Sequence, residues 1–108
     1  MGGMRLARAI RKRTQLDQAI EKIKETLGPD VVRLRYNLGE DWTGDSAIFF
    51  HIVISDEASR RDRLLTSTQQ IKETIVRQLE PLEEWDVLPY FSYRNQSEFA
   101  ALQDKAWV

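Results

Sequence analysis

The sequence predicts an α+β fold, a ferredoxin-like half with the order α-β-β-α-β-α, in which a three-stranded sheet carries two long helices on one face. Two long segments, 4–27 and 57–80, repeat apolar residues at the three- and four-residue spacing of amphipathic helices. Segments with the alternation or the β-branched content of strands lie between and after them. A helix connects the second strand to the third, so these two strands are expected to be parallel.

Length and composition indicate one domain, 1–108, that buries roughly two thirds of its unfolded surface. Sixteen basic and seventeen acidic residues leave a net charge of −1, which disfavours a general nucleic-acid binder. The absence of cysteine excludes disulfides, thiol nucleophiles and Cys-ligated zinc. No apolar run reaches the about 18 residues of a membrane span, and the N-terminus lacks the apolar part of a secretory signal. We therefore expect a cytoplasmic protein without membrane contact.

The first helix is expected over residues 4–27, because apolar residues from Leu16 to Leu27 fall on one face. Gly28 and Pro29 suit its end. Its beginning is strongly basic and contains no acid, which is typical either of a solvated helix start or of a contact with nucleic acid. The cations of this basic segment are Arg5, Arg8, Arg11, Lys12 and Arg13.

Two strands are expected next. Residues 31–38 alternate, with Val32, Leu34, Tyr36 and Leu38 on the inward face. Residues 46–54 form the most apolar run of the chain and are the expected central strand. Its inward face is Ile48, Phe50, Ile52 and Ile54, and its outward face is Ala47, Phe49, His51 and Val53.

The second long helix is expected at about residues 57–80, after a cap at Ser55 or Asp56 and before Pro81. A third strand follows near 85–93, and Pro89 indicates an edge or a bulge because proline cannot donate a ladder hydrogen bond. A short helix is expected at about 96–106, because Asn95 and Glu98 have the spacing of a capping box.

If the helices cover the more apolar side of the sheet, the other side carries a mixture of apolar groups and arginines. Such a mixture is typical of a surface that binds a protein partner. Alternatively the C-terminal segment, with Phe99 and Trp107, folds across this side, or the protein associates with itself. The candidate partner-binding residues are Arg33, Arg35, Phe49, His51, Tyr90 and Arg94.

Catalytic and metal-binding motifs are sparse, so no catalytic residue, metal site or cofactor is assigned. His51 is the only histidine and is expected to be buried and hydrogen-bonded. The acidic loop Glu40–Asp45 could hold Mg²⁺ or Ca²⁺ but lacks the spacing of an EF-hand. A surface turn with Trp42 packed back on the domain is the expected alternative. The basic-glycine start of an RNA-recognition motif is absent before Phe49.

Three segments resemble a family of small bacterial proteins: DWTGDSAIFF at 41–50, ISDEAS at 54–59 and PYFSYRNQSE at 89–98. The resemblance implies a partner of a helical HEPN-type protein in a toxin–antitoxin-like pair. It implies no activity and transfers no catalytic residue.

Three hypotheses follow. The first is a non-enzymatic protein-interaction module, antitoxin-like, that binds a protein partner or forms a homodimer. The alternative is nucleic-acid binding through the basic segment, with Arg33 and Arg35 assisting. The second alternative is a metal- or nucleotide-dependent enzyme that uses the Glu40–Asp45 loop.

Overall fold

The structure is a computed structural model that describes residues 6–102. Arg5 of the basic segment and Trp107 of the expected cover lie outside the described residues. The described elements are α1 (Arg8–Arg11), α2 (Arg13–Thr26), β1 (Val31–Glu40), β2 (Ser46–Ile54), α3 (Leu64–Leu79), α4 (Pro81–Trp85), β3 (Leu88–Asn95) and α5 (Gln96–Ala101).

The three strands form one mixed sheet in the order β1-β2-β3. β1 and β2 pair antiparallel as a hairpin, and β2 and β3 pair parallel. The parallel pair follows from the connection, because a chain that leaves β2 and returns through α3 re-enters the sheet in the same direction. The predicted α+β class with a three-stranded sheet is confirmed.

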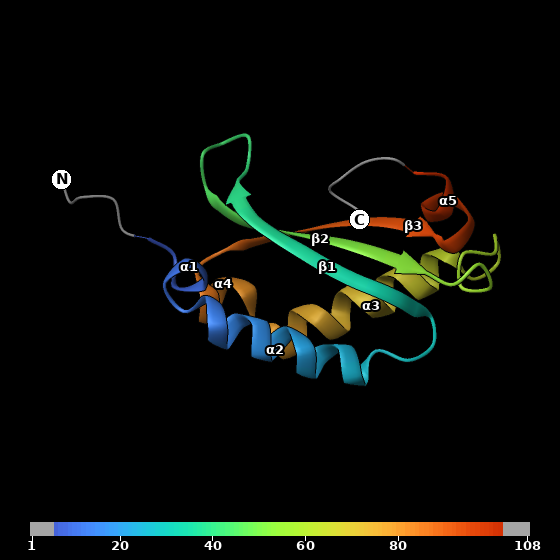
Figure 1. Ribbon diagram of the computed structural model, residues 1–108, viewed down its shortest axis with the longest axis horizontal. Coiled ribbons are helices and arrows are strands. Elements are labelled where there is room, and N and C mark those ends of the chain that lie inside the picture. Colours follow the sequence, from blue (N-terminus) through green and yellow to red (C-terminus); the bar gives the residue numbers. More distant parts are fainter. Residues whose placement is uncertain (1–5, 103–108) are drawn as a thin grey trace.

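The two longest helices, α2 and α3, lie on one side of the sheet, and α5 lies on the other (Figure 1). β2 is the central strand and sends Ile48, Phe50, Ile52 and Ile54 into the layer between sheet and helices, where all four are buried. The Phe50 ring stacks on Phe91 of β3, with 5.2 Å between ring centroids. The helices contribute the other half of this core: Leu16, Ile20, Ile23, Ile71, Ile75 and Leu79.

No helix formed by residues 6–102 is both long and apolar enough to cross a membrane.

The prediction of one continuous helix over 4–27 is wrong, because the described chain turns at Lys12 (φ −119°, ψ 48°) between α1 and α2. The turn folds α1 onto α4, where the Arg8 N–H donates to Asp86 Oδ2 (3.1 Å) and Ala9 is buried. A straight helix would leave Ala9 without this contact. The end of α2 at Thr26, before Gly28 and Pro29, agrees with the prediction.

The second long helix begins later than predicted, at Leu64 instead of 57. Ser55 does cap a turn, since its Oγ accepts from the Ala58 N–H (3.0 Å), but the turn does not continue into α3. Asp56 is used elsewhere: its carboxylate accepts from the N–H (3.1 Å) and hydroxyl (2.9 Å) of Ser97 in α5. Residues 55–63 therefore anchor α5 to the sheet.

Pro81 ends α3 but also begins the short helix α4, so β3 starts at Leu88 and not at 85. Left-handed residues flank α4, Glu80 (φ 51°) before it and Asp86 (φ 60°) after it, and reverse the chain direction. α5 begins with the predicted capping box of Asn95 and Glu98 and ends at Ala101. The remainder of the predicted helix, beyond residue 102, lies outside the described residues.

A bulge in β1 changes one predicted face. Val31 pairs with Ile54 and Arg33 with Val53, so Val32 is the extra residue. Val31 packs against the core, and Val32 is half exposed. The prediction that Val32 points inward is therefore wrong, whereas the alternation from Arg33 to Leu38 holds.

Candidate functional site

The side of the sheet opposite α2 and α3, here called the open face, carries every predicted partner-binding residue. The strand register arranges it in rows of three, one residue from each strand. The rows are Asn37–Phe49–Tyr90, Arg35–His51–Ser92 and Arg33–Val53–Arg94. Sequence reasoning thus brought together Arg33, Arg35, Phe49, His51, Tyr90 and Arg94 correctly, because residues of one parity share one face of a sheet.

At the hairpin end of the open face, three aromatic side chains form what we call the aromatic cluster: Trp42, Phe49 and Tyr90. Phe49 and Tyr90 stack across β2 and β3 with 5.4 Å between ring centroids. Trp42, from the loop between β1 and β2, meets the Tyr90 ring edge-on at 5.6 Å. Trp42 is nevertheless 83% exposed, so the expectation that it packs back on the domain is wrong.

The acidic loop is held by Asp41. Its Oδ1 accepts from the N–H groups of Thr43 (2.9 Å) and Asp45 (3.0 Å), and its Oδ2 accepts from the Tyr90 hydroxyl (2.8 Å). The hydrogen bond from the Thr43 hydroxyl is the main cause that lowers the pKa of Asp41 from 3.8 to about 2. The same Asp41 contact raises the pKa of Tyr90. These bonds give Asp41 a structural role that places Trp42 beside Tyr90.

The middle row of the open face is polar. His51 Nε2 lies 2.6 Å from Asn37 Oδ1, so the expected hydrogen bond is confirmed, whereas His51 is half-buried and not buried as predicted. Arg35 and Ser92, on either side of His51, are exposed. Among residues 6–102 no three His, Cys, Asp or Glu side chains gather in a group that could hold a metal ion.

At the opposite end, α5 covers the open face. The Arg33 guanidinium lies 4.9 Å from the centroid of the Phe99 ring, and Val53 is only 1% exposed. Arg33 Nε is buried with no hydrogen-bond partner among residues 6–102. Arg94 donates to the carbonyl oxygen of Tyr93 (2.9 Å). The expected cover by the C-terminal segment is therefore correct for Phe99 at this end, while the aromatic cluster and the middle row are left uncovered by α5.

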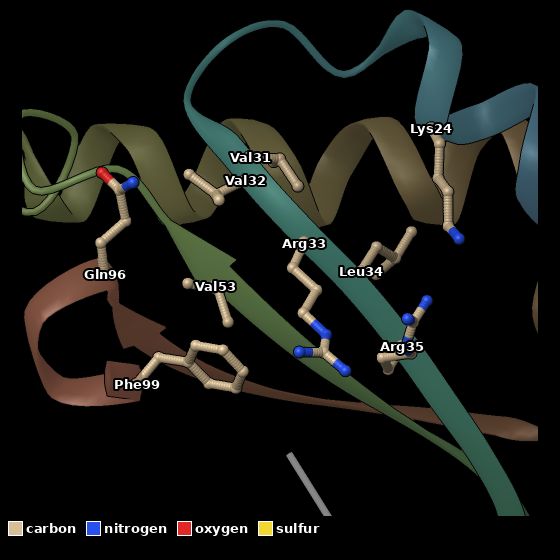
Figure 2. Close-up of a pocket in the computed structure, with 9 residues that line it drawn as sticks. All are labelled: Lys24, Val31, Val32, Arg33, Leu34, Arg35, Val53, Gln96 and Phe99. Atoms are coloured by element: carbon tan, nitrogen blue, oxygen red, sulfur yellow. The ribbon is translucent and has the colours of Figure 1, made fainter. Parts of the chain in front are cut away.

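A concavity of about 590 Å³ lies along the outer edge of β1, and residues from both faces of the sheet line it. Lys24, Arg33 and Arg35 bring three cations to it, and in Figure 2 Arg35 is drawn nearer to Lys24 and Arg33 nearer to Phe99. Lys24 also pairs with Glu21 (2.7 Å). This basic edge was not predicted as a unit, because Lys24 belongs to a helix and the arginines to a strand.

The basic N-terminal segment is partly occupied by contacts within the protein. Arg8 donates to the Glu84 carbonyl oxygen (2.8 Å), and Arg11 donates to the Leu6 carbonyl oxygen (3.2 Å). Arg13 donates to the Tyr36 hydroxyl (2.6 Å), and its guanidinium lies over the Tyr36 ring. These arginines therefore have structural partners, which weakens the case for a nucleic-acid arm.

Comparison of the chain with models of protein families, with curated proteins and with solved structures found no match. The resemblance to the family of HEPN partners therefore stays a prediction.

Two features of the site were not predicted from the sequence: the exposure of Trp42, and the contact that fixes where α5 lies on the open face. Trp42 could have been identified by its place at the tip of an acidic hairpin loop, where a large side chain has little to pack against. The position of α5 on the open face depends on the contact of Asp56 with Ser97, which joins residues 41 positions apart and leaves no local signal.

Proposed function

We propose that the protein is a non-enzymatic interaction module that binds a partner protein through the uncovered part of the open face. The observation that carries the proposal is the aromatic cluster, in which Trp42 remains 83% exposed beside Tyr90 and Phe49. Large aromatic side chains exposed at one place are typical of the central contacts of protein interfaces. An isolated domain gains little from keeping a tryptophan in water, so a partner is the simplest reason for this arrangement.

The neighbouring groups define the partner's chemistry. Arg35 and Asn37 are exposed next to the cluster, and His51 is half-buried between them and β3. A fitting partner segment is amphipathic: apolar side chains contact Trp42 and Tyr90, and an acidic side chain pairs with Arg35. Since α5 covers the far end of the face, the segment has to lie over the hairpin half of the sheet.

An amphipathic helix satisfies these requirements, which is consistent with the helical HEPN-type partner implied by the sequence resemblance and with an antitoxin-like role in the cytoplasm. The chain order of the elements, a β-hairpin followed by a helix and a further strand, is what supports the finer description of the fold as a ferredoxin-like half.

The test is reconstitution with a partner identified from the native host. The partner is expressed separately, and its affinity is measured by isothermal titration calorimetry. Trp42→Ala should weaken binding at least about tenfold, since central aromatic contacts contribute more than about 1.4 kcal/mol each. Leu65→Ala is the matched control, because Leu65 is equally prominent (77% exposed) but lies on α3.

Arg35→Glu should weaken the same complex and make the remaining affinity less dependent on salt, because it removes an attractive charge. A partner that binds Trp42→Ala and Arg35→Glu as well as the unmodified protein would contradict the proposal. If only Leu65→Ala abolishes binding, the partner binds α3 and not the open face.

A further inference from the structure

The two edges of the sheet differ in how many backbone N–H and C=O groups are available to pair with another strand. In β2, alternate residues direct their backbone groups to β1 and to β3. Phe50 is directed to β3, where its register partner is Phe91. In a parallel pair the residues on either side of Phe91, Tyr90 and Ser92, bond to β2, so Phe91 directs its own N–H and C=O outward. The outward set of β3 is therefore Pro89, Phe91, Tyr93 and Asn95.

Most of this outward set cannot pair with a further strand. Pro89 has no N–H, and the Asn95 N–H donates to Glu98 Oε1 (3.0 Å). The Tyr93 carbonyl oxygen accepts from the guanidinium of Arg94 (2.9 Å). Proline and occupied backbone groups are devices that protect an edge from association. The β3 edge is closed in this sense.

The β1 edge is open. Glu40 pairs with Ser46, and the Asp41 N–H donates to the Asp45 carbonyl oxygen (2.9 Å), which makes Glu40–Ser46 a non-hydrogen-bonded pair. Glu40 therefore directs its backbone groups away from β2, and counting back in steps of two adds Leu38, Tyr36 and Leu34. Apart from the bulge at Val32, no proline or local cap interrupts this edge within the described strand.

We propose that a second copy of the chain pairs with this edge, antiparallel, about a twofold axis at Tyr36. Leu34 of one copy then lies opposite Leu38 of the other, and the two Tyr36 residues lie opposite each other. Each of these pairs exchanges two backbone hydrogen bonds. The two sheets become one continuous sheet, with the helices of both copies on one side and both open faces on the other. A twofold axis closes the assembly at a dimer.

The charges along β1 favour this arrangement. The first half of the edge is basic, with Lys24 and Arg35 lining its concavity (Figure 2), and the second half leads to Glu40 and Asp41. Antiparallel pairing places the basic half of one copy beside the acidic half of the other, twice by symmetry. Arg35 lies opposite Asn37, so no like charges meet directly across the axis.

Exposed apolar groups lie at the same edge. Leu6 (51% exposed) and Ile10 (45% exposed) line a second concavity with Leu38 at the acidic end of β1. Val32 (50% exposed) lies at the basic end. In the proposed register Val32 is brought to the end of the partner copy that carries Leu6 and Ile10, which removes apolar surface from water in both copies.

The dimer is independent of the partner protein proposed above, and its test uses the purified chain alone. Sedimentation equilibrium or light scattering from micromolar to millimolar concentration should show a monomer–dimer equilibrium. Two substitutions at one exposed position probe the register. Asn37→Glu places a carboxylate opposite Arg35 of the other copy, and Asn37→Lys places a like charge there.

The two variants differ at His51 as well, because a carboxylate can still accept a hydrogen bond from His51 Nε2 and an ammonium group cannot. The melting temperature of each variant, measured at a concentration where it is monomeric, gives this difference within one chain, and a separation of the dimer dissociation constants beyond it reports the charge across the axis. Two symmetric cross-strand pairs should lower the dimer dissociation constant of Asn37→Glu, and raise that of Asn37→Lys, by roughly two- to thirtyfold. Ser92→Glu and Ser92→Lys are the controls, because Ser92 is exposed on the same face but lies on β3. Their dissociation constants should not separate in this way.

A disulfide test gives the register directly, because the natural sequence has no cysteine. Arg35 and Asn37 of opposite copies form a non-hydrogen-bonded pair with about 4.5 Å between Cα atoms, within the range of disulfides. An equimolar mixture of Arg35→Cys and Asn37→Cys should therefore oxidise to a covalent dimer much faster than either variant alone. Ser92→Cys should not.

A chain that stays monomeric overturns the proposal, and the β1 edge would then be a site for a strand of another protein. A dimer whose dissociation constant is the same for Asn37→Glu and Asn37→Lys also overturns it, because the interface would lie elsewhere. Neither result would bear on binding of a partner at the aromatic cluster.

Discussion

Two neighbouring phenylalanines of β2 provide the sharpest test of which side of the sheet is core. Phe50 is fully buried against the helices and stacks on Phe91, whereas Phe49 is half-buried on the open face. Phe50→Ala removes a buried ring and leaves a cavity, so it should lower the free energy of unfolding by about 3–5 kcal/mol. Phe49 is only half-buried, so Phe49→Ala loses less hydrophobic stabilisation and should lower the free energy of unfolding by about 1–2 kcal/mol.

Urea denaturation followed by circular dichroism measures both values. With a slope of about 1–1.5 kcal/mol per molar urea for a domain of this size, Phe50→Ala should lower the midpoint by about 2–5 M. Because such a loss is a large part of the total stability of a small domain, Phe50→Leu serves as a milder second variant with a cost below about 1.5 kcal/mol. If Phe49→Ala lowers the free energy of unfolding as much as Phe50→Ala does, both faces of the sheet are core, and the assignment of Phe49 to an exposed face is wrong.

Three further outcomes follow from single contacts. The pKa of Asp41 is lowered to about 2, so its carboxylate stabilises the fold above about pH 4 and this stabilisation is lost as the pH falls towards 2. The melting temperature of Asp41→Asn should therefore depend less on pH over that range than that of the unmodified protein. Burial and the hydrogen bond to Asp17 raise the pKa of Tyr36 to about 12, so the protonated Tyr36 hydroxyl stabilises the fold below pH 10 and this stabilisation is lost as the pH rises to 12. The melting temperature of Tyr36→Phe should therefore fall less steeply at alkaline pH than that of the unmodified protein. Asn95→Ala removes the cap of α5 and should cost about 1 kcal/mol of its local stability, measured as faster hydrogen exchange of amides in 96–101, and unchanged exchange there would contradict the capping role.

The sheet was predictable because its signals are local. The alternation of residues 33–38 and the apolar run around Phe50 specify strands and their faces without knowledge of the rest of the chain. The parallel pairing of β2 and β3 followed from the helix between them. Even the capping box of Asn95 and Glu98 was readable, since it depends on a spacing of three residues.

The errors concern contacts between segments far apart in the sequence. The turn at Lys12 depends on α4, which holds the N–H of Arg8 through Asp86, 78 positions away. The turns before α3 make contacts with distant segments: Asp56 accepts from Ser97 in α5, and Arg63 pairs with Asp30 (3.0 Å). A helical pattern in one segment contains no information about such competing tertiary contacts.

The position of α5 determines which part of the open face stays exposed. Asp56, two residues after the end of β2, binds Ser97 in the first turn of α5, so the chain that leaves the central strand fixes where the helix lies. Phe99 then occupies the end of the face where Arg33 and Val53 would otherwise be exposed. At the other end Asp41 ties the hairpin loop to Tyr90 and leaves Trp42 in water. One end of the open face is therefore covered by α5, and at the other end a hydrogen-bonded loop keeps Trp42 exposed. Specific contacts within the fold, and not a lack of neighbouring chain, determine that the aromatic cluster is exposed.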